Sequence, residues 1–145
     1  MRISFTAFGE AKPGGSKTAF AFKRKDGSLG ANVVDSCKTV KSWRHVVATA
    51  AREVYDGPLL DGPLSLTLVF HTPRPKAHFG KHGLKRTAPV HPTKRPDCLK
   101  LARAVEDSLS SVVYRDDSQI VQEILFKNYG EPARCEVTIV ELERT

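Results

Sequence analysis

Carboxylates stand at both ends of one basic helical segment in the second half of the chain. Asp97 follows Pro96, while Asp116 and Asp117 come after the segment and before an apolar run. Two or three carboxylates can hold the Mg²⁺ ion on which phosphodiester hydrolysis commonly depends. Because these acids lie among bases, they indicate a metal site beside a polyanion. Each has a structural alternative: Asp97 as a helix N-cap, and the Asp116–Asp117 pair as a polar turn.

The excess positive charge of the chain is concentrated around these acids. The formal net charge is +7 over 145 residues. Between His71 and Arg103, nine bases face one acid, Asp97, whereas the other 14 bases face 15 acids. The nine are Arg74, Lys76, Lys81, Lys85, Arg86, Lys94, Arg95, Lys100 and Arg103. Such a local excess is typical of a phosphate-binding face, with a solvated loop as the alternative.

The elements that must position these residues follow from the hydrophobic periodicity. Side chains that alternate between apolar and polar, bounded by turn residues, predict strands. Apolar residues that recur every three or four positions predict helices. The predicted strands are Arg2–Phe8, Thr18–Arg24, Leu64–Phe70, Ile120–Lys127 and Cys135–Leu142. The predicted helices run from a cap at Asp35 or Ser36 to Gly57-Pro58, and from Asp97 to Ser111. We expect an α/β (α+β) fold over residues 1–145, one domain with a mixed sheet and two main helices packed on it.

The helix that begins at Asp97 constrains the site. A helix of about 15 residues is about 22 Å long. The acids at its two ends can therefore converge only if the connection after the helix doubles back, or if a second subunit contributes.

Other features limit the class of protein. No segment has the roughly 18 apolar residues of a membrane span, and the N-terminus lacks the apolar core of a signal peptide, so a cytoplasmic protein is expected. Three cysteines without C-x-x-C spacing do not indicate a disulfide framework. The proline-rich stretch after the strand Leu64–Phe70 is predicted to be a loop without regular structure. It contains His71, His78, His82 and His91, which leave zinc as a minor alternative.

Two motifs in order, P-D-x-x-K-L-x-R-A from Pro96 and Y-R-D-D-S-Q-I-V from Tyr114, closely resemble the RusA family of Holliday-junction resolvases of bacteria and their phages. The segments GEAKPGGSKTAF, with its Pro-x-Gly-Ser-Lys pattern, and FHTPRPKAHFG, with Pro-Arg-Pro-Lys, resemble other parts of that family. The resemblance implies a homodimeric, Mg²⁺-dependent endonuclease that cuts four-way DNA junctions, with Mn²⁺ as a possible substitute for Mg²⁺. For a phage-encoded chain, the compartment would be the bacterial host cytoplasm.

The resemblance also implies roles for single residues. The family's catalytic acids are the two of a D-x-D motif and the second of the D-D pair, and the first and last map to Asp97 and Asp117. A basic residue of the family maps to Arg103, which can bind phosphate through two donors but cannot act as an acid or base. We take Asp116 as a further catalytic candidate. Lys94, Arg95, Lys100, Arg103, Arg74, Lys76 and Lys17 are the expected DNA contacts.

The middle acid of the family pattern is missing, because Leu99 stands where the second Asp of D-x-D is expected. Glu106 lies seven residues further, about 20° around the helix and about 10.5 Å along its axis from Leu99. We hypothesise that Glu106, with Asp107 as second choice, replaces the lost metal ligand. The structural alternative is an exposed Glu paired with a base on the same helix. A DNA- or junction-binding protein that has lost cleavage, and an RNA-directed or flap nuclease, are competing functions.

Overall fold

A four-stranded mixed sheet forms the centre of the computed structural model, which describes residues 1–15, 17–35 and 39–144. Its strands lie in the order β1-β8-β4-β7, with β4 and β7 parallel and the other two pairings antiparallel. They are β1 (Arg2–Phe8), β4 (Leu64–Thr72), β7 (Ile120–Tyr129) and β8 (Arg134–Glu141). β7 is an edge strand with its outer side unpaired among the described residues.

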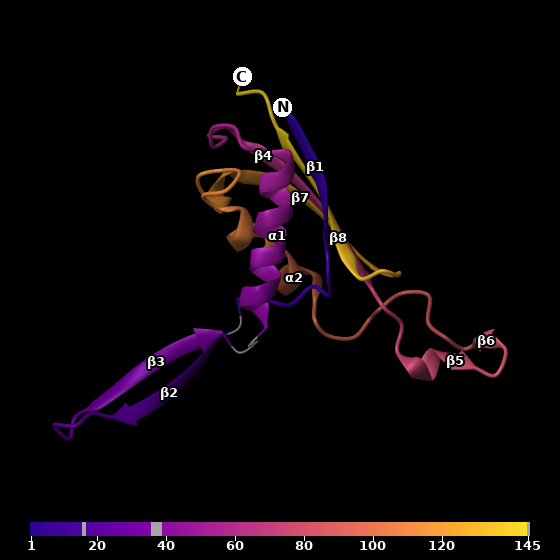
Figure 1. Ribbon diagram of the computed structural model, residues 1–145, viewed down its shortest axis with the longest axis horizontal. Helices are drawn as coiled ribbons and strands as arrows, with labels where there is room; N and C mark the ends of the chain where they lie inside the picture. The colour runs from indigo at the N-terminus through magenta and orange to yellow at the C-terminus, as the bar shows by residue number, and fades with distance from the viewer. Residues whose placement is uncertain (16, 36–38, 145) are drawn as a thin grey trace.

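Two helices, α1 (Val40–Val54) and α2 (Cys98–Leu109), supply the other half of the core. Alternate residues of β4 from Leu64 to Phe70 are buried, as expected for a strand with one covered face. They pack with buried side chains of both helices, including Trp43 of α1 and Val105 of α2. The β4 side chains that alternate with these buried ones, such as Thr67, lie on the face of the sheet that neither helix covers. The result is a sheet with helices on one side (Figure 1).

Two arms extend from this body in different directions (Figure 1). One is the antiparallel hairpin of β2 (Lys17–Lys23) and β3 (Leu29–Asp35). The other lies between β4 and α2 and contains the single-turn helix η1 (Lys76–His78) and the short hairpin of β5 (Phe79–Gly80) and β6 (Gly83–Leu84). We call residues 73–93 the basic arm.

The predicted fold class and the five predicted strands are confirmed, with shifts of one or two residues at their ends. Three details of the prediction were wrong. β3 was not predicted. Asp35 belongs to β3, so it does not cap α1, which begins at Val40 after Thr39; Ser36 lies outside the described residues. The proline-rich stretch does contain regular structure, because Gly83 adopts a φ of 97° that closes the β5–β6 turn and few other residues adopt such a conformation.

Within the described residues, neither helix has the length and apolar character needed to cross a membrane.

Candidate active site

Asp97 occupies the N-cap of α2. Its Oδ1 accepts a hydrogen bond from the backbone N–H of Lys100 at 2.9 Å, so the capping role considered for this residue is present. The side chain is exposed, and it lines a hollow with Pro13, Arg95 and Lys100. Asp97 thus faces solvent within a group of bases, which is suitable for contact with a phosphate-bound cation.

Three hydrogen bonds to backbone carbonyls hold this end of α2. The Nζ of Lys127 on β7 donates to the carbonyl oxygens of Lys94 and Pro96, both at 2.9 Å. On the other side, the N–H of Gly14 donates to the carbonyl of Lys100 at 2.8 Å. A Cβ at Gly14 would lie 3.1 Å from the backbone nitrogen of Ala104, so a larger residue would move the loop and the helix apart by a few tenths of an ångström. The end of β7 and the root of the β2–β3 arm therefore meet at Asp97.

A second group of acids lies at the other end of α2. Glu106, in the last part of the helix, faces Glu123 of β7, and their carboxyl groups share a hydrogen bond. Glu123 pairs with the buried Leu66 across the sheet, so its side chain is on the helix-covered face. Asp117 is near enough to Glu106 to affect its titration. We call Glu106, Asp117 and Glu123 the acidic triad.

Burial is the largest influence on the proton affinity of this group. It raises the pKa of Glu106 from its ordinary value of 4.5 to about 7, with the negative charges of Glu123 and Asp117 adding to the effect and the positive charge of Arg103 opposing it. Burial also raises the pKa of Glu123, against the hydrogen bond from Glu106. At neutral pH the pair therefore tends to hold a proton between two oxygens, as expected for crowded carboxyls without a cation.

The end of α2 and the turn after it fix the position of Asp117. The buried Tyr114 donates from its hydroxyl to the carbonyl of Glu106 at 2.8 Å. The side chain of Gln119 donates to the carbonyls of Leu60 and Gly62, both at 3.0 Å. The two Gln119 bonds tie the single-turn helix η2 (Asp117–Gln119) to the body.

Two other acids considered from the sequence have structural partners. Asp107, the second choice for the missing ligand, pairs with Arg44 of α1 at 3.3 Å. Asp116 caps η2 in a reciprocal capping box with Gln119, and hydrogen bonds from Ser118 lower its pKa. Asp107 and Asp116 are therefore not counted among the acids that surround Glu106.

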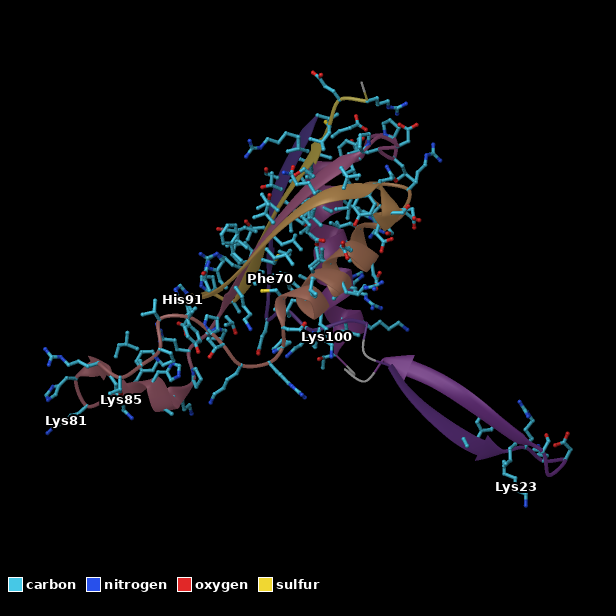
Figure 2. All side chains as sticks on the ribbon, turned by 180° about the vertical axis from the view of Figure 1, so that it is seen from behind. Lys23, Phe70, Lys81, Lys85, His91 and Lys100 are labelled. Atoms are coloured by element: carbon cyan, nitrogen blue, oxygen red, sulfur yellow. The ribbon has the colours of Figure 1, made fainter. Side chains whose placement is uncertain are left out.

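The expected DNA contacts lie in several places. Lys94, Arg95, Lys100, Arg103 and Lys76 are exposed. In the view of Figure 2, Lys100 lies between the two arms. Arg74 is only partly exposed, since its guanidinium donates to the carbonyl of Pro89 at 2.7 Å and lies 4.3 Å from the ring centre of Tyr129. The backbone of Lys17 belongs to β2, and its side chain lies outside what the structure describes.

The structure brings Glu106 and Asp117 together but leaves Asp97 at the opposite end of α2. The helix has 12 residues, which corresponds to about 18 Å. Among the described residues, no three acid, histidine or cysteine side chains lie close enough to hold a metal ion. Leu99 is 74% exposed beside Asp97 and supplies no ligand. The oxygen donors suit Mg²⁺, yet the described part of one chain does not assemble a complete site.

Glu123 is the member of the acidic triad that the sequence reasoning missed. The strand Ile120–Tyr129 carries apolar residues at both parities, among them Val121, Ile124, Leu125 and Phe126. Alternation alone therefore does not say which face of the strand is covered. Glu123 stands two residues before Leu125, so both side chains lie on the same face of the strand, and Leu125 packs against the core. This spacing is the feature of the sequence that could have placed Glu123.

Comparison with known proteins agrees with these features. The family model described as endodeoxyribonuclease RusA matches residues 13–140. The chain is also 30% identical, over 145 residues, to the uncharacterized protein YqaN of Bacillus subtilis (strain 168), which covers 97% of this chain and 96% of that protein. The matched range contains both ends of α2, the acidic triad and both arms. The chain belongs to the RusA family of endodeoxyribonucleases.

Proposed function

We propose that this RusA-family chain is a Mg²⁺-dependent endodeoxyribonuclease that resolves four-way DNA junctions as a homodimer, in DNA recombination and repair. The observation that carries the proposal is the acidic triad at one end of α2, in a chain of this family whose excess of bases lies toward the other end of the same helix. Partly desolvated acids close to one another are costly unless a proton or a cation neutralises them. Such a group of acids in a chain with a large excess of bases favours a site for a divalent cation over a merely structural pair.

The ligands we propose for Mg²⁺, or Mn²⁺ in its place, are Glu106, Asp117 and Glu123, with Asp97 completing the site. When bound, such a cation relieves charge on the phosphate and makes water a stronger nucleophile. The chain's own part is to hold the phosphodiester in place. Arg103 is exposed on α2 near Glu106 and can bind two phosphate oxygens at once.

A second subunit would bring Asp97 to the acidic triad. β7 begins beside Asp117 and ends beside Pro96, where Lys127 is bonded. If two copies paired their β7 edges antiparallel about a two-fold axis, the end of one strand would lie next to the start of the other. Asp97 of the partner subunit would then approach Glu123 and Asp117. Ile124 and Phe126, which are 43% and 48% exposed on this edge strand, would gain apolar contacts in such a pairing.

The test is cleavage of a labelled four-way junction, measured with Mg²⁺ and with EDTA. Wild-type protein is expected to make paired nicks only when the metal is present. Glu106→Gln and Glu123→Gln should slow cleavage by about 100-fold or more, because a held cation contributes several kcal/mol to transition-state stabilisation. Asp107→Asn is the matched control on the same helix and should cleave like wild type. Full activity of Glu106→Gln would contradict the proposed ligand set.

A second candidate function is junction binding without cleavage. It is favoured by the exposed Leu99 in the position of a family acid and by the lack of a three-ligand cluster in the described part of one chain. Tight junction binding with no nicks at any Mg²⁺ or Mn²⁺ concentration would establish it in place of the nuclease. Duplex, flap and RNA substrates in the same assay would reveal a different substrate class.

A further inference from the structure

We propose that the tip of the basic arm inserts Phe79 and Leu84 against unstacked bases at a DNA branch point. The proposal rests on the proposed function, in that it takes branched DNA as the ligand. It concerns a surface separate from the acidic triad.

The charge of the arm is of one sign. Residues 73–93 contain five Lys or Arg and no Asp or Glu. Lys76, Lys81, Lys85 and Arg86 are all exposed, and none of them forms an ion pair within the part of the chain that the structure describes. Lys81 and Lys85 lie far out on the arm, away from the sheet (Figure 2). Uncompensated charge on a projecting element favours a polyanionic partner.

The tip is also apolar. Phe79 and Leu84 pair across the β5–β6 hairpin and are 48% and 53% exposed. A two-residue hairpin has no core in which to bury them. An apolar pair surrounded by bases matches the way nucleic-acid-binding proteins place a wedge between bases while cations hold the phosphates. An uninterrupted duplex hides its base faces, whereas a branch point exposes them.

The arm is built to hold this tip in position. The N–H of Lys85 donates to the carbonyl of His78 at 2.9 Å. At the root, the ring of His78 meets the ring of Tyr129 edge-on at 5.4 Å, and Arg74 covers the same ring. The arm is therefore anchored to the end of β7, the strand that carries Glu123.

A junction with 2-aminopurine beside the branch point tests the proposal, in Ca²⁺ or EDTA so that cleavage plays no part. Wild type should raise 2-aminopurine fluorescence and bind the junction more tightly than a duplex of equal length. The double variant Phe79→Ala/Leu84→Ala should lose the fluorescence rise and about tenfold in junction affinity, the order expected for a lost base-stacking contact. Its duplex affinity should be unchanged. Val54→Ala, equally exposed at the far end of α1, is the control.

The contribution of the arm's positive charge to DNA binding is tested with a separate variant. Lys81→Ala/Lys85→Ala should weaken junction and duplex binding alike and reduce the salt slope by about 1.8, since each neutralised phosphate contributes about 0.9. A Phe79→Ala/Leu84→Ala variant that keeps the fluorescence rise and the junction preference would overturn the proposal, as would a wild type without junction preference. Neither result would decide whether the protein is a nuclease, because Mg²⁺-dependent cleavage is measured in a separate assay.

Discussion

Glu106 and Glu123 form an unusual contact at the scale of single residues. Two carboxyl groups from a helix and an edge strand share a hydrogen bond, with Asp117 nearby. In the proposed function, a divalent cation takes the place of the proton that this pair shares. Cation binding should accordingly release protons and strengthen as the pH rises toward 7, because ligands must be deprotonated to bind.

The same carboxyl predicts how stability depends on pH. The pKa of Glu106 rises from 4.5 to about 7 on folding, so the folded state binds more protons than the unfolded state between these values. The free energy of unfolding should therefore fall as the pH rises. A fully buried group would contribute about 3.4 kcal/mol, and solvent screening at this half-exposed site reduces the effect to roughly 1–2 kcal/mol.

Urea unfolding of wild type and Glu106→Gln, without divalent metal, between about pH 5 and pH 8 checks this prediction. Wild type should lose stability across the range, and Glu106→Gln should not, so that the variant is the more stable protein at the alkaline end. Asp107→Asn should keep the wild-type dependence. Parallel curves for wild type and Glu106→Gln would show that this carboxyl does not have the raised pKa.

At the scale of elements, α2 is a rigid spacer with one acid at its start and another near its end. β7 runs back along it, from Asp117 to the loop before Asp97, and Lys127 closes the far end. This cation is only partly exposed and bonds two backbone carbonyls. It orders the loop that carries Lys94 and Arg95.

Lys127→Met is expected to destabilise the protein by about 1–3 kcal/mol, since it removes two hydrogen bonds from a charged donor and leaves carbonyls less well satisfied. Amide hydrogen exchange should increase around residues 94–97, ahead of any change in β1 or β8. Lys76→Met, on the exposed arm, serves as the control. Unchanged protection near Asp97 in the Lys127 variant would mean that the loop is held by other contacts.

The elements with clear periodicity could be predicted from the sequence, and the others could not. Leu64 to Phe70 show alternation, and α2 carries an apolar stripe. The structure buries these same side chains, because one face of each element is covered. β3 was missed since its residues do not alternate, and the arm hairpin depends on a turn at Gly83 more than on side-chain pattern. The separation of Asp97 from Asp117 was anticipated from helix length. The contact of Glu106 with Glu123 was not, because it depends on sheet register.

At the scale of the whole molecule, both arms and the start of α2 lie toward the same end (Figure 1), while the acidic triad lies at the other end of α2. One chain therefore presents a basic end and, at the opposite end of α2, a cluster of acids. The proposed two-fold pairing would place the Asp97 end of each copy at the triad of the other. The arms would then lie on both sides of a symmetric substrate.

Mixing two inactive variants tests this arrangement. Asp97→Asn retains an N-cap, and Glu106→Gln keeps the shape of its side chain, so both should fold. If each site combines Asp97 of one subunit with Glu106 of the other, a mixed dimer has one doubly altered site and one intact site. Equimolar mixing, with subunit exchange, should then restore nicking to about a quarter of the wild-type rate, since half the dimers are mixed and each has one of two sites. Sites built within single chains would each retain one substitution, so a mixture as inactive as its parts would exclude the shared site.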